Sequence, residues 1–199
     1  MHPTATFRHD VRADHEALIA AYPFAHIFLQ TPDGPRVAHT PVLSTGDGAL
    51  QFHLAKRNAL TPHIEGSRAL VVFNGPHGYI SPRWYEGTQE VPTWNYIALE
   101  CEGRVRRMHE EGLEAFLETF GNRQEDAIAD GTPWRMARLS QAAKIALLRG
   151  IVGFELEVAE WRETYKLSQN KGEADTIGVT EGLEREGNRA LAAAMKAAR

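Results

Sequence analysis

Two groups of residues in this sequence could together bind a flat, phosphorylated ligand. Lys56 and Arg57 follow a predicted strand, where they could hold a phosphate dianion through charge-assisted hydrogen bonds. The stretch from Gly75 to Tyr96 contains two of the chain's four Trp, three of its five Tyr and three of its ten Pro. Large rings stiffened by proline suit a slot for a planar ligand. Flavin mononucleotide (FMN) has both a flat ring system and a phosphate, so it fits this pair of features.

Each group also has a structural interpretation, and other chemistries have less support. Basic residues at a strand end are often solvated, and an aromatic stretch can seal a core or a subunit interface. The nine histidines include no His-Glu-x-x-His pair or other close ligand spacing, so we expect no metal site. The sequence also lacks the Gly-x-Ser-x-Gly turn of many hydrolases, the Gly-x-Gly-x-x-Gly loop of dinucleotide-binding domains and a Walker phosphate loop.

Composition and charge describe an ordinary globular chain. The 199 residues are 43% hydrophobic and 24% charged, which is enough for one well-filled core. The net charge of -4 gives no support for general nucleic-acid affinity. Cys101 is the only cysteine, so no internal disulfide can form. Because the chain lacks a basic start followed by an apolar run, we expect a cytoplasmic protein without a membrane span.

The elements that must position these groups follow from the hydrophobic pattern. Asp14 is expected to cap a short helix that Pro23 ends, and residues 32–35 are expected to turn the chain between two strands. The alternation around Phe52 places His53 on the face opposite the core. Strands are predicted over residues 24–31, 36–43, 49–54, 69–73, 96–105 and 152–158, the fourth of them buried on both faces.

Helical periodicity becomes prominent late in the chain. Apolar residues spaced i, i+3, i+4 and i+7 predict an amphipathic helix over residues 113–120, and a second helix is predicted over residues 136–147 and ended by Gly150. After Asn170 the composition turns polar, and a terminal helix is predicted over residues 191–198. Six strands with hairpin turns and late helices predict an α+β fold, a small antiparallel barrel with helical additions.

Seven blocks of the sequence occur together, in this order, in one known family: Tyr22-Pro-Phe-Ala25, Ala38-His-Thr-Pro41, His53-Leu-Ala-Lys-Arg-Asn58, Gly75-Pro-His-Gly-Tyr-Ile-Ser-Pro-Arg-Trp-Tyr85, Val91-Pro-Thr-Trp-Asn-Tyr96, Arg149-Gly-Ile-Val-Gly153 and Lys166-Leu-Ser-Gln-Asn170. The long aromatic block and the last block are highly specific. On these blocks the chain resembles the PaiB family of FMN-binding proteins. Its members are labelled negative transcriptional regulators and belong to the split-barrel flavin-binding group.

The resemblance implies a fold, a cofactor and a partner. It implies an FMN-binding antiparallel split barrel with peripheral helices over residues 1–170. The composition adds a polar segment and helix over residues 171–199, which we expect to pack on the barrel or extend from it. It also implies a homodimer with FMN at or near the subunit interface. A symmetric partner would cover more ring surface than a monomer usually leaves in water. The aromatic residues expected near that interface are Trp84, Tyr85, Trp94 and Tyr96.

The resemblance also implies which residues form the site. By their place in the blocks, residues 56–58 correspond to the phosphate end of FMN, and residues 39–43 to the strand whose backbone passes the ring. No residue is implied to be catalytic. The implied cofactor-binding residues are His39, Thr40, Pro41, Val42, Leu43, His53, Lys56, Arg57, Asn58, Trp94, Asn95, Lys166, Ser168, Gln169 and Asn170.

The sequence departs from the family pattern at three positions. Tyr165 stands where Trp is usual, Arg83 where a small residue is common, and Gly78 where Ala is common. We expect Gly78 to be neutral, whereas Tyr165 and Arg83 could alter what binds over the flavin.

Three functions remain open on this sequence. The family label makes the protein a transcriptional regulator that acts through bound flavin. An FMN-dependent oxidoreductase acting on a small molecule is an alternative, because related split barrels pass hydrides or electrons through their flavin. A haem-binding barrel is another, with His39, His53 or His77 as the axial ligand. Direct DNA binding is doubtful because the chain is acidic and shows no helix-turn-helix signal. The residues that could make the terminal helix basic are Arg185, Arg189, Lys196 and Arg199.

Overall fold

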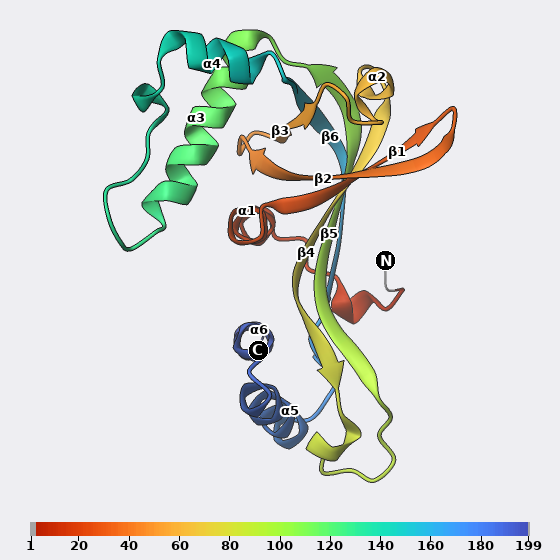
Figure 1. Cartoon of the computed structure of the whole chain (residues 1–199). Helices are drawn as coiled ribbons and strands as arrows, with labels where there is room; N and C mark the ends of the chain where they lie inside the picture. The colour runs from red at the N-terminus through yellow and green to blue at the C-terminus, as the bar shows by residue number, and fades with distance from the viewer. Residues whose placement is uncertain (1–2, 199) are drawn as a thin grey trace. The chain divides into compact units, whose positions relative to one another are not determined.

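The computed structural model describes residues 3–198 and contains a closed barrel of six strands (Figure 1). Neighbouring strands follow the order β1-β2-β3-β6-β5-β4, which confirms the predicted α+β barrel with peripheral helices. The strands are β1 (Phe24–Thr31), β2 (Gly34–Ser44), β3 (Ala49–Ala55), β4 (Arg68–Ile80), β5 (Thr93–Arg107) and β6 (Ile151–Lys166). The helices are α1 (Arg12–Ala21), α2 (Thr61–Ile64), α3 (Glu110–Asp126), α4 (Gln141–Leu148), α5 (Glu173–Arg185) and α6 (Arg189–Ala197).

The chain divides into two compact units, and each is described by itself. The barrel unit comprises Glu16–Val72 and Cys101–Trp161. The terminal unit has its described residues in 3–15, 73–100 and 162–198. The predicted division at residue 170 cuts the chain elsewhere and stays a prediction. Within residues 3–198, no helix has the length and apolar character needed to cross a membrane.

In the barrel unit, β1 and β2 form the predicted hairpin. Phe24 lies opposite Pro41, and Thr31 lies opposite Gly34 at the turn. Gly34 has a φ of +100°, a backbone conformation that L side chains rarely adopt. Alternate residues of β3 enter the core as predicted, and Phe52 is fully buried there. The hairpin and β3 therefore follow directly from local sequence signals.

Helix α3 packs on the barrel unit through the face that its periodicity predicts. Leu113 and Phe116 are buried in a cluster with Leu43 of β2. Gly153 of β6 permits this approach, because a Cβ at that position would lie 2.7 Å from Met108 Cε and 3.1 Å from Leu113. A glycine near the start of this strand therefore sets how closely the helix approaches the sheet.

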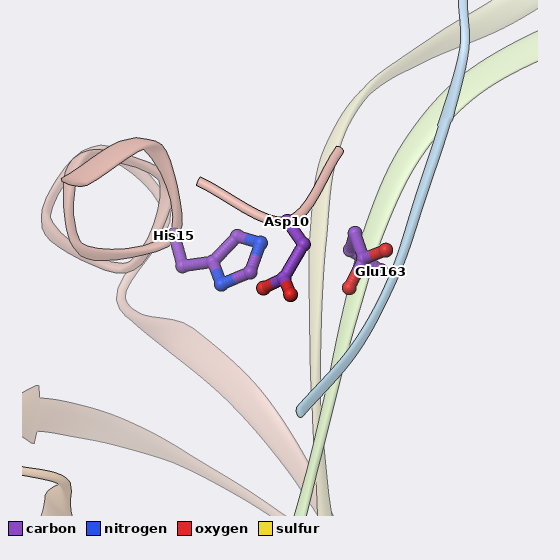
Figure 2. Close-up of side chains that lie close together, drawn as sticks. All are labelled: Asp10, His15 and Glu163. Atoms are coloured by element: carbon purple, nitrogen blue, oxygen red, sulfur yellow. The ribbon is translucent and has the colours of Figure 1, made fainter. Parts of the chain in front are cut away.

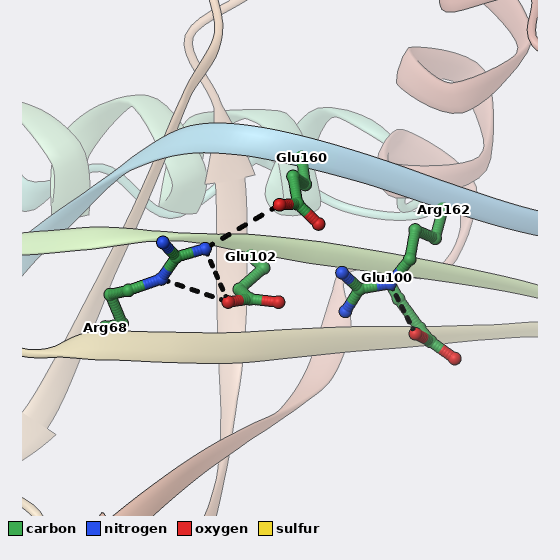
Figure 3. A network of polar contacts seen from close by, with 5 residues as sticks. All are labelled: Arg68, Glu100, Glu102, Glu160 and Arg162. Carbon is green, nitrogen blue, oxygen red and sulfur yellow. Dashed lines mark hydrogen bonds and ion pairs between the residues drawn. The ribbon is translucent and has the colours of Figure 1, made fainter.

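Charged side chains of β4, β5 and β6 pair at the sheet surface (Figure 3). In the barrel unit, Arg68 of β4 binds Glu102 of β5 at 2.7 Å and lies 3.8 Å from Glu160 of β6. In the terminal unit, Arg162 of β6 binds Glu100 of β5 at 3.1 Å. Solvent-accessible pairs of this kind contribute at most about 1 kcal/mol each. They support the register of the three strands, whereas the apolar core supplies most of the stability.

In the terminal unit, Trp84 packs into a notch on α5 formed by two glycines. A Cβ on Gly182 would lie 2.4 Å from the indole ring, and a Cβ on Gly178 would lie 2.2 Å from the carbonyl oxygen of Trp84. The two glycines are four residues apart and therefore share one helix face. Trp84, which the sequence predicts near a subunit interface, is thus covered in part by its own chain.

Gly78 has a structural role that the sequence interpretation did not assign. A Cβ there would lie 2.6 Å from Asn188 Nδ2 and 3.1 Å from Leu191 Cδ2. Asn188 caps α6 by accepting a hydrogen bond from the backbone N–H of Leu191, and its Nδ2 donates to the carbonyl oxygen of His77 at 2.9 Å. Alanine at residue 78 would crowd this cap, so Gly78 has a structural role, and its expected neutrality toward flavin binding stays a prediction.

Other local predictions also differ from the structure. Helix α1 begins at Arg12, so Asp14 lies in the first turn and not at the cap, where it still favours the helix dipole. Strand β4 continues to Ile80 and includes the first part of the aromatic stretch. Since β1 pairs only with residues 70–72 of β4, the later part of the strand tolerates Pro76.

The C-terminal elements were the least well predicted. The proposed second helix is a 3-10 turn at Met136–Arg138 followed by α4. Helix α5 was not predicted at all.

Two strand predictions also differ from the structure. The strand predicted over residues 69–73 is present within β4, but Leu70 and Val72 are only half-buried, so the prediction that both faces are buried is wrong. Strand β6 runs on to Lys166 and so carries the start of the last family block.

Candidate functional site

The barrel unit contains a pocket rich in cations at the end of β3, here called the cationic pocket. It has a volume of about 300 Å³. Positive side chains reach it from three segments: Lys56 after β3, Arg107 at the end of β5, and Arg149 between α4 and β6. Its lining consists of Lys56, Arg107, Met108, His109, Glu110, Leu113, Ile145, Leu148, Arg149, Ile151, Val152 and Gly153.

Backbone hydrogen bonds fix the segments that carry these cations. The N–H of Lys56 donates to the carbonyl oxygen of Gly150 at 2.9 Å, which ties the end of β3 to the start of β6. The N–H of Arg149 donates to Ile145 at 3.1 Å and closes the end of α4. The N–H of Met108 donates to Gly153 at 3.0 Å. Three separate elements therefore hold their cations around one small volume.

The structure gives different environments to the three residues predicted at the phosphate end, Lys56, Arg57 and Asn58. Lys56 and Arg57 are both exposed, but only Lys56 lines the cationic pocket. Asn58 Oδ1 accepts a hydrogen bond from the N–H of Leu60 at 2.9 Å, so this side chain shapes the turn after β3. Arg107, His109 and Arg149 were missed as site residues, although the family block at Arg149–Gly153 contained a signal for the last.

The predicted strand of residues 39–43 contributes mostly to the core. Val42 and Leu43 are buried, and Pro41 is half-buried. Thr40 donates its hydroxyl hydrogen to the carbonyl oxygen of His53 at 2.9 Å. His39 is exposed, and its Nδ1 lies 2.6 Å from the Nδ1 of His26.

His53 does lie opposite the core face of β3, but α3 covers that side. Its ring centroid is 5.9 Å from that of Phe116. Burial lowers the pKa of His53 below its ordinary value, because the charged form is poorly solvated there. Among residues 3–198, its buried Nδ1 has no hydrogen-bond partner. The site therefore offers a neutral imidazole with one unsatisfied nitrogen.

The terminal unit contains a second pocket, here called the amide pocket, with a volume of about 320 Å³. Four predicted site residues meet in it: Asn95 of β5, Lys166 of β6, and Ser168 and Asn170 of the loop that follows. The other lining residues are Thr4, Phe7, Tyr85, Glu90, Val91, Thr93 and Lys171.

Asn95 lines this pocket, and its side chain has an unsatisfied acceptor. Its side chain is fully buried, and its Nδ2 donates to Ser168 Oγ at 2.8 Å. Within the described residues, its Oδ1 has no hydrogen-bond partner. Ser168 itself has a φ of 63°, the only positive value among the described residues other than glycine. Buried acceptors without a partner and strained backbone both occur often at binding sites. A bound ligand can donate a hydrogen bond to such an acceptor, and its contacts can offset the cost of the strain.

The side chains of Lys166 and Gln169 bind neighbouring residues and so stabilise the loop that begins after β6. Lys166 Nζ donates to Thr93 Oγ1 at 2.8 Å and to the carbonyl oxygen of Trp94 at 2.5 Å, and burial lowers the pKa of Lys166. Gln169 Oε1 accepts from the N–H of Leu167 at 2.8 Å, so Gln169 closes the loop. Trp94 is 55% exposed.

Sequence reasoning missed an ion pair at the rim of the amide pocket. Lys171 binds Glu90 at 2.5 Å, and this hydrogen bond raises the pKa of Lys171. Its Nζ also lies 5.1 Å from the ring centroid of Tyr85, whose own pKa is raised by burial. The departures at residues 83 and 165 line neither pocket. Tyr165 instead lies beside His9, and burial raises its pKa to about 12.

Comparison with known proteins agrees with this architecture. A family model described as "Putative FMN-binding domain" matches residues 1–160. Protease synthase and sporulation protein PAI 2 of Bacillus subtilis is 38% identical over 119 residues, which cover 60% of this chain and 56% of that protein. An uncharacterized protein of Emericella nidulans is 30% identical over 189 residues, covering 78% of this chain and 75% of that protein. The chain thus spans little more than half the length of PAI 2.

Solved structures show the same fold at low sequence identity. The FAD and heme binding protein from Mycobacterium smegmatis is 14% identical, with a TM-score of 0.63 over 85% of this chain and 78% of the other. The flavocytochrome Anf3 from Azotobacter vinelandii is 15% identical, with a TM-score of 0.59 over 85% and 74%. The split barrel is therefore confirmed, and the match to the family model, with its FMN cofactor, supports the predicted resemblance to PaiB. This chain belongs to the family of FMN-binding domains that includes relatives of PAI 2.

Proposed function

We propose that the cationic pocket holds the phosphate of FMN and that the protein is a regulator of the PaiB type acting through this flavin. The observation that carries the proposal is the convergence of Lys56, Arg107 and Arg149 from three elements on one pocket. A phosphate dianion accepts several charge-assisted hydrogen bonds, and arginine can supply two of them in parallel. The start of α3 at Glu110 adds the positive end of a helix dipole, although the Glu110 carboxylate also lines the pocket.

The shape of the pocket fits one end of FMN better than the whole molecule. A volume of about 300 Å³ is at the lower limit for sites that enclose a drug-sized ligand. The ring system would therefore extend beyond the phosphate end. When bound, FMN supplies hydride and single-electron chemistry at its ring. Lys56 and Arg149 would hold the phosphate, and Leu113 and Leu148 would exclude water from the inner wall.

We also propose that the amide pocket of the terminal unit binds a ligand group. The orphan Oδ1 of Asn95 would accept a hydrogen bond from an N–H group of a ligand bound in the amide pocket. Ser168 fixes the orientation of that amide by accepting from its Nδ2. Asn95 and Ser168 therefore act as positioning groups in this proposal.

A homodimer completes the proposed arrangement. In the barrel unit, the outward face of the β1–β2 hairpin exposes Phe24 by 61%, Phe28 by 43% and Val37 by 40%. Phe28 and Val37 lie directly opposite each other. Exposed apolar side chains gathered on one sheet face are typical of protein interfaces, and a second copy of the chain would cover them. A cytoplasmic location is part of the proposal and agrees with a chain whose one cysteine, Cys101, can form no internal disulfide.

The visible spectrum of the purified protein tests the flavin part of the proposal. We expect flavin bands, and release of FMN rather than riboflavin or FAD when the protein is denatured. A Soret band without flavin would instead support the haem alternative and overturn the FMN assignment. The oxidoreductase alternative is tested separately, by reduction of the bound flavin with NADH and NADPH under anaerobic conditions.

Regulation is expected not to use direct DNA recognition. Two cations that could make the C-terminal helices basic are paired with carboxylates, Lys196 with Glu184 at 2.6 Å and Arg185 with Glu181 at 3.8 Å. The hydrogen bond from Lys196 also lowers the pKa of Glu184, so Glu184 stays ionised and balances the positive charge of Lys196. Arg199 lies outside the described residues. A mobility-shift assay with DNA from the upstream region of the protein's own gene, at physiological salt, should show no shifted band at nanomolar protein. A shift that survives competitor DNA would reject this expectation.

A further inference from the structure

A group of metal-ligating side chains lies in the terminal unit outside the amide pocket. Ligand atoms of Asp10, His15 and Glu163 all lie within 4.8 Å of one another. Figure 2 shows the three side chains converging from the segment before α1, from the start of α1 and from β6. His15 is 1% exposed and Glu163 is 5% exposed, whereas Asp10 is exposed. The group thus has a buried interior and a side open to solvent.

A second contact fixes which nitrogen of His15 can act as a ligand. His15 Nε2 lies 3.0 Å from the carbonyl oxygen of His9. A carbonyl oxygen only accepts hydrogen bonds, so Nε2 must carry the hydrogen, and in the neutral ring Nδ1 carries the lone pair. Metal-bound histidines commonly donate their other ring N–H to a backbone carbonyl in this way. His15 is therefore already held in the tautomer that a metal requires.

Glu163 is oriented by the same N-terminal segment. The N–H of His9 donates to Glu163 Oε1 at 3.3 Å, and the ring of His9 binds Asp14 at 2.5 Å. Residue 9 therefore contacts two members of the group through its backbone and anchors itself to α1 through its side chain. Such outer contacts hold ligands in place before the metal arrives.

The two carboxylates of the group, on Asp10 and Glu163, favour binding of a cation. These two carboxylates, one of them buried, lie within 4.8 Å of each other and of an imidazole. A divalent ion bound by all three side chains would be surrounded by oxygen and nitrogen ligands and would balance the two negative charges. One imidazole nitrogen with two carboxylate oxygens suits borderline transition-metal ions such as Zn²⁺, and it leaves coordination positions for water.

We propose that Asp10, His15 and Glu163 bind one Zn²⁺-like transition-metal ion, which fastens the N-terminal segment to β6. Metal–ligand bonds of about 2.1 Å imply tetrahedral ligand spacings of about 3.4 Å, so the group closes slightly on binding. Asp10 is exposed and lies outside a helix, so its side chain can make that adjustment. The sequence did not indicate this site because Glu163 lies far along the chain from the other two ligands.

The test uses the full-length, FMN-loaded protein without an affinity tag, and Asp10→Asn as the variant. This change keeps the shape of an exposed side chain and so leaves folding intact, whereas replacing buried His15 could prevent it. Asp33→Asn, in the exposed β1–β2 turn, is the matched control. Zn²⁺ binding is measured by equilibrium dialysis with metal analysis, Co²⁺ coordination by visible absorption, and thermal stability with Zn²⁺ or with a chelator.

We expect one Zn²⁺ per chain in wild type and in Asp33→Asn, and at least about tenfold weaker binding in Asp10→Asn. Saturating Zn²⁺ should raise the Tm of wild type by roughly 5–10 °C and leave that of Asp10→Asn nearly unchanged. The proposal is overturned if Zn²⁺ binds wild type and Asp10→Asn equally, if no ion binds stoichiometrically, or if Mg²⁺ binds as tightly as Zn²⁺. The flavin spectrum is recorded in parallel, so loss of FMN and loss of metal are distinguished.

Discussion

Replacing Arg149 with Ala should weaken FMN binding by roughly ten- to a hundredfold and leave riboflavin binding unchanged. Arg149 lies in the cationic pocket between α4 and β6, where its guanidinium can bind a phosphate through two parallel hydrogen bonds. Each charge-assisted bond contributes about 1.5–3 kcal/mol, and one decade in affinity corresponds to about 1.4 kcal/mol. Riboflavin lacks the phosphate, so its affinity reports any loss of the remaining site.

The chain supplies a matched control for this change. Arg57 carries the same charge, is adjacent to Lys56 in sequence and is exposed outside the pocket. Arg57→Ala therefore removes the same net charge and should reduce FMN affinity less than threefold, a change of about 0.6 kcal/mol. Fluorescence titration of both ligands into wild type and both variants measures the difference. Equal losses in Arg149→Ala and Arg57→Ala would show that net charge, and not the pocket, controls affinity.

The second large effect is expected in the barrel unit at Gly103 of β5. A Cβ at this position would lie 1.9 Å from the carbonyl oxygen of Glu157 and 2.8 Å from Leu156 Cδ2. The closest atom belongs to backbone, so the variant can fold only if two strands separate. Gly103→Ala should therefore lower the free energy of unfolding by roughly 3 kcal/mol or more.

Gly121 of α3 is the appropriate comparison. It lies inside a helix, and a Cβ there would meet no atom within 4 Å. Gly121→Ala should raise the free energy of unfolding by about 0.5–1 kcal/mol, because alanine favours the helix and loses less backbone entropy. Urea denaturation at a fixed FMN concentration gives both values. Stability of Gly103→Ala within about 0.5 kcal/mol of wild type would be incompatible with the close approach of β5 and β6.

The barrel strands could be predicted because their signals are local. Strand β1 was predicted with its observed bounds, since the alternation over residues 24–31 ends at a strong turn sequence. Helix α5 was missed for a physical reason: its buried face includes Thr176, Thr180 and Gly182 as well as Val179 and Leu183, so hydrophobicity alone does not reveal it. Packing of Trp84 against small residues of this helix takes the place of a large apolar stripe.

The candidate site could be predicted only where one segment carries it. Lys56 follows β3 directly, and the family blocks pointed to Asn95 and Ser168, which the structure brings into one pocket. Arg107 and Arg149 join Lys56 only through the order of β3, β6 and β5 in the barrel, which no local pattern encodes. The same reason hid the group of Asp10, His15 and Glu163.

A crystal structure of the protein with FMN bound tests most directly whether the cationic pocket is the phosphate site. We expect phosphate oxygens within about 3 Å of Lys56 Nζ and of the Arg149 guanidinium. The phosphate should also be well separated from the exposed side chain of Arg57. Phosphate density against Arg57, or in the amide pocket, with Lys56 and Arg149 unchanged from the flavin-free protein, would contradict the assignment.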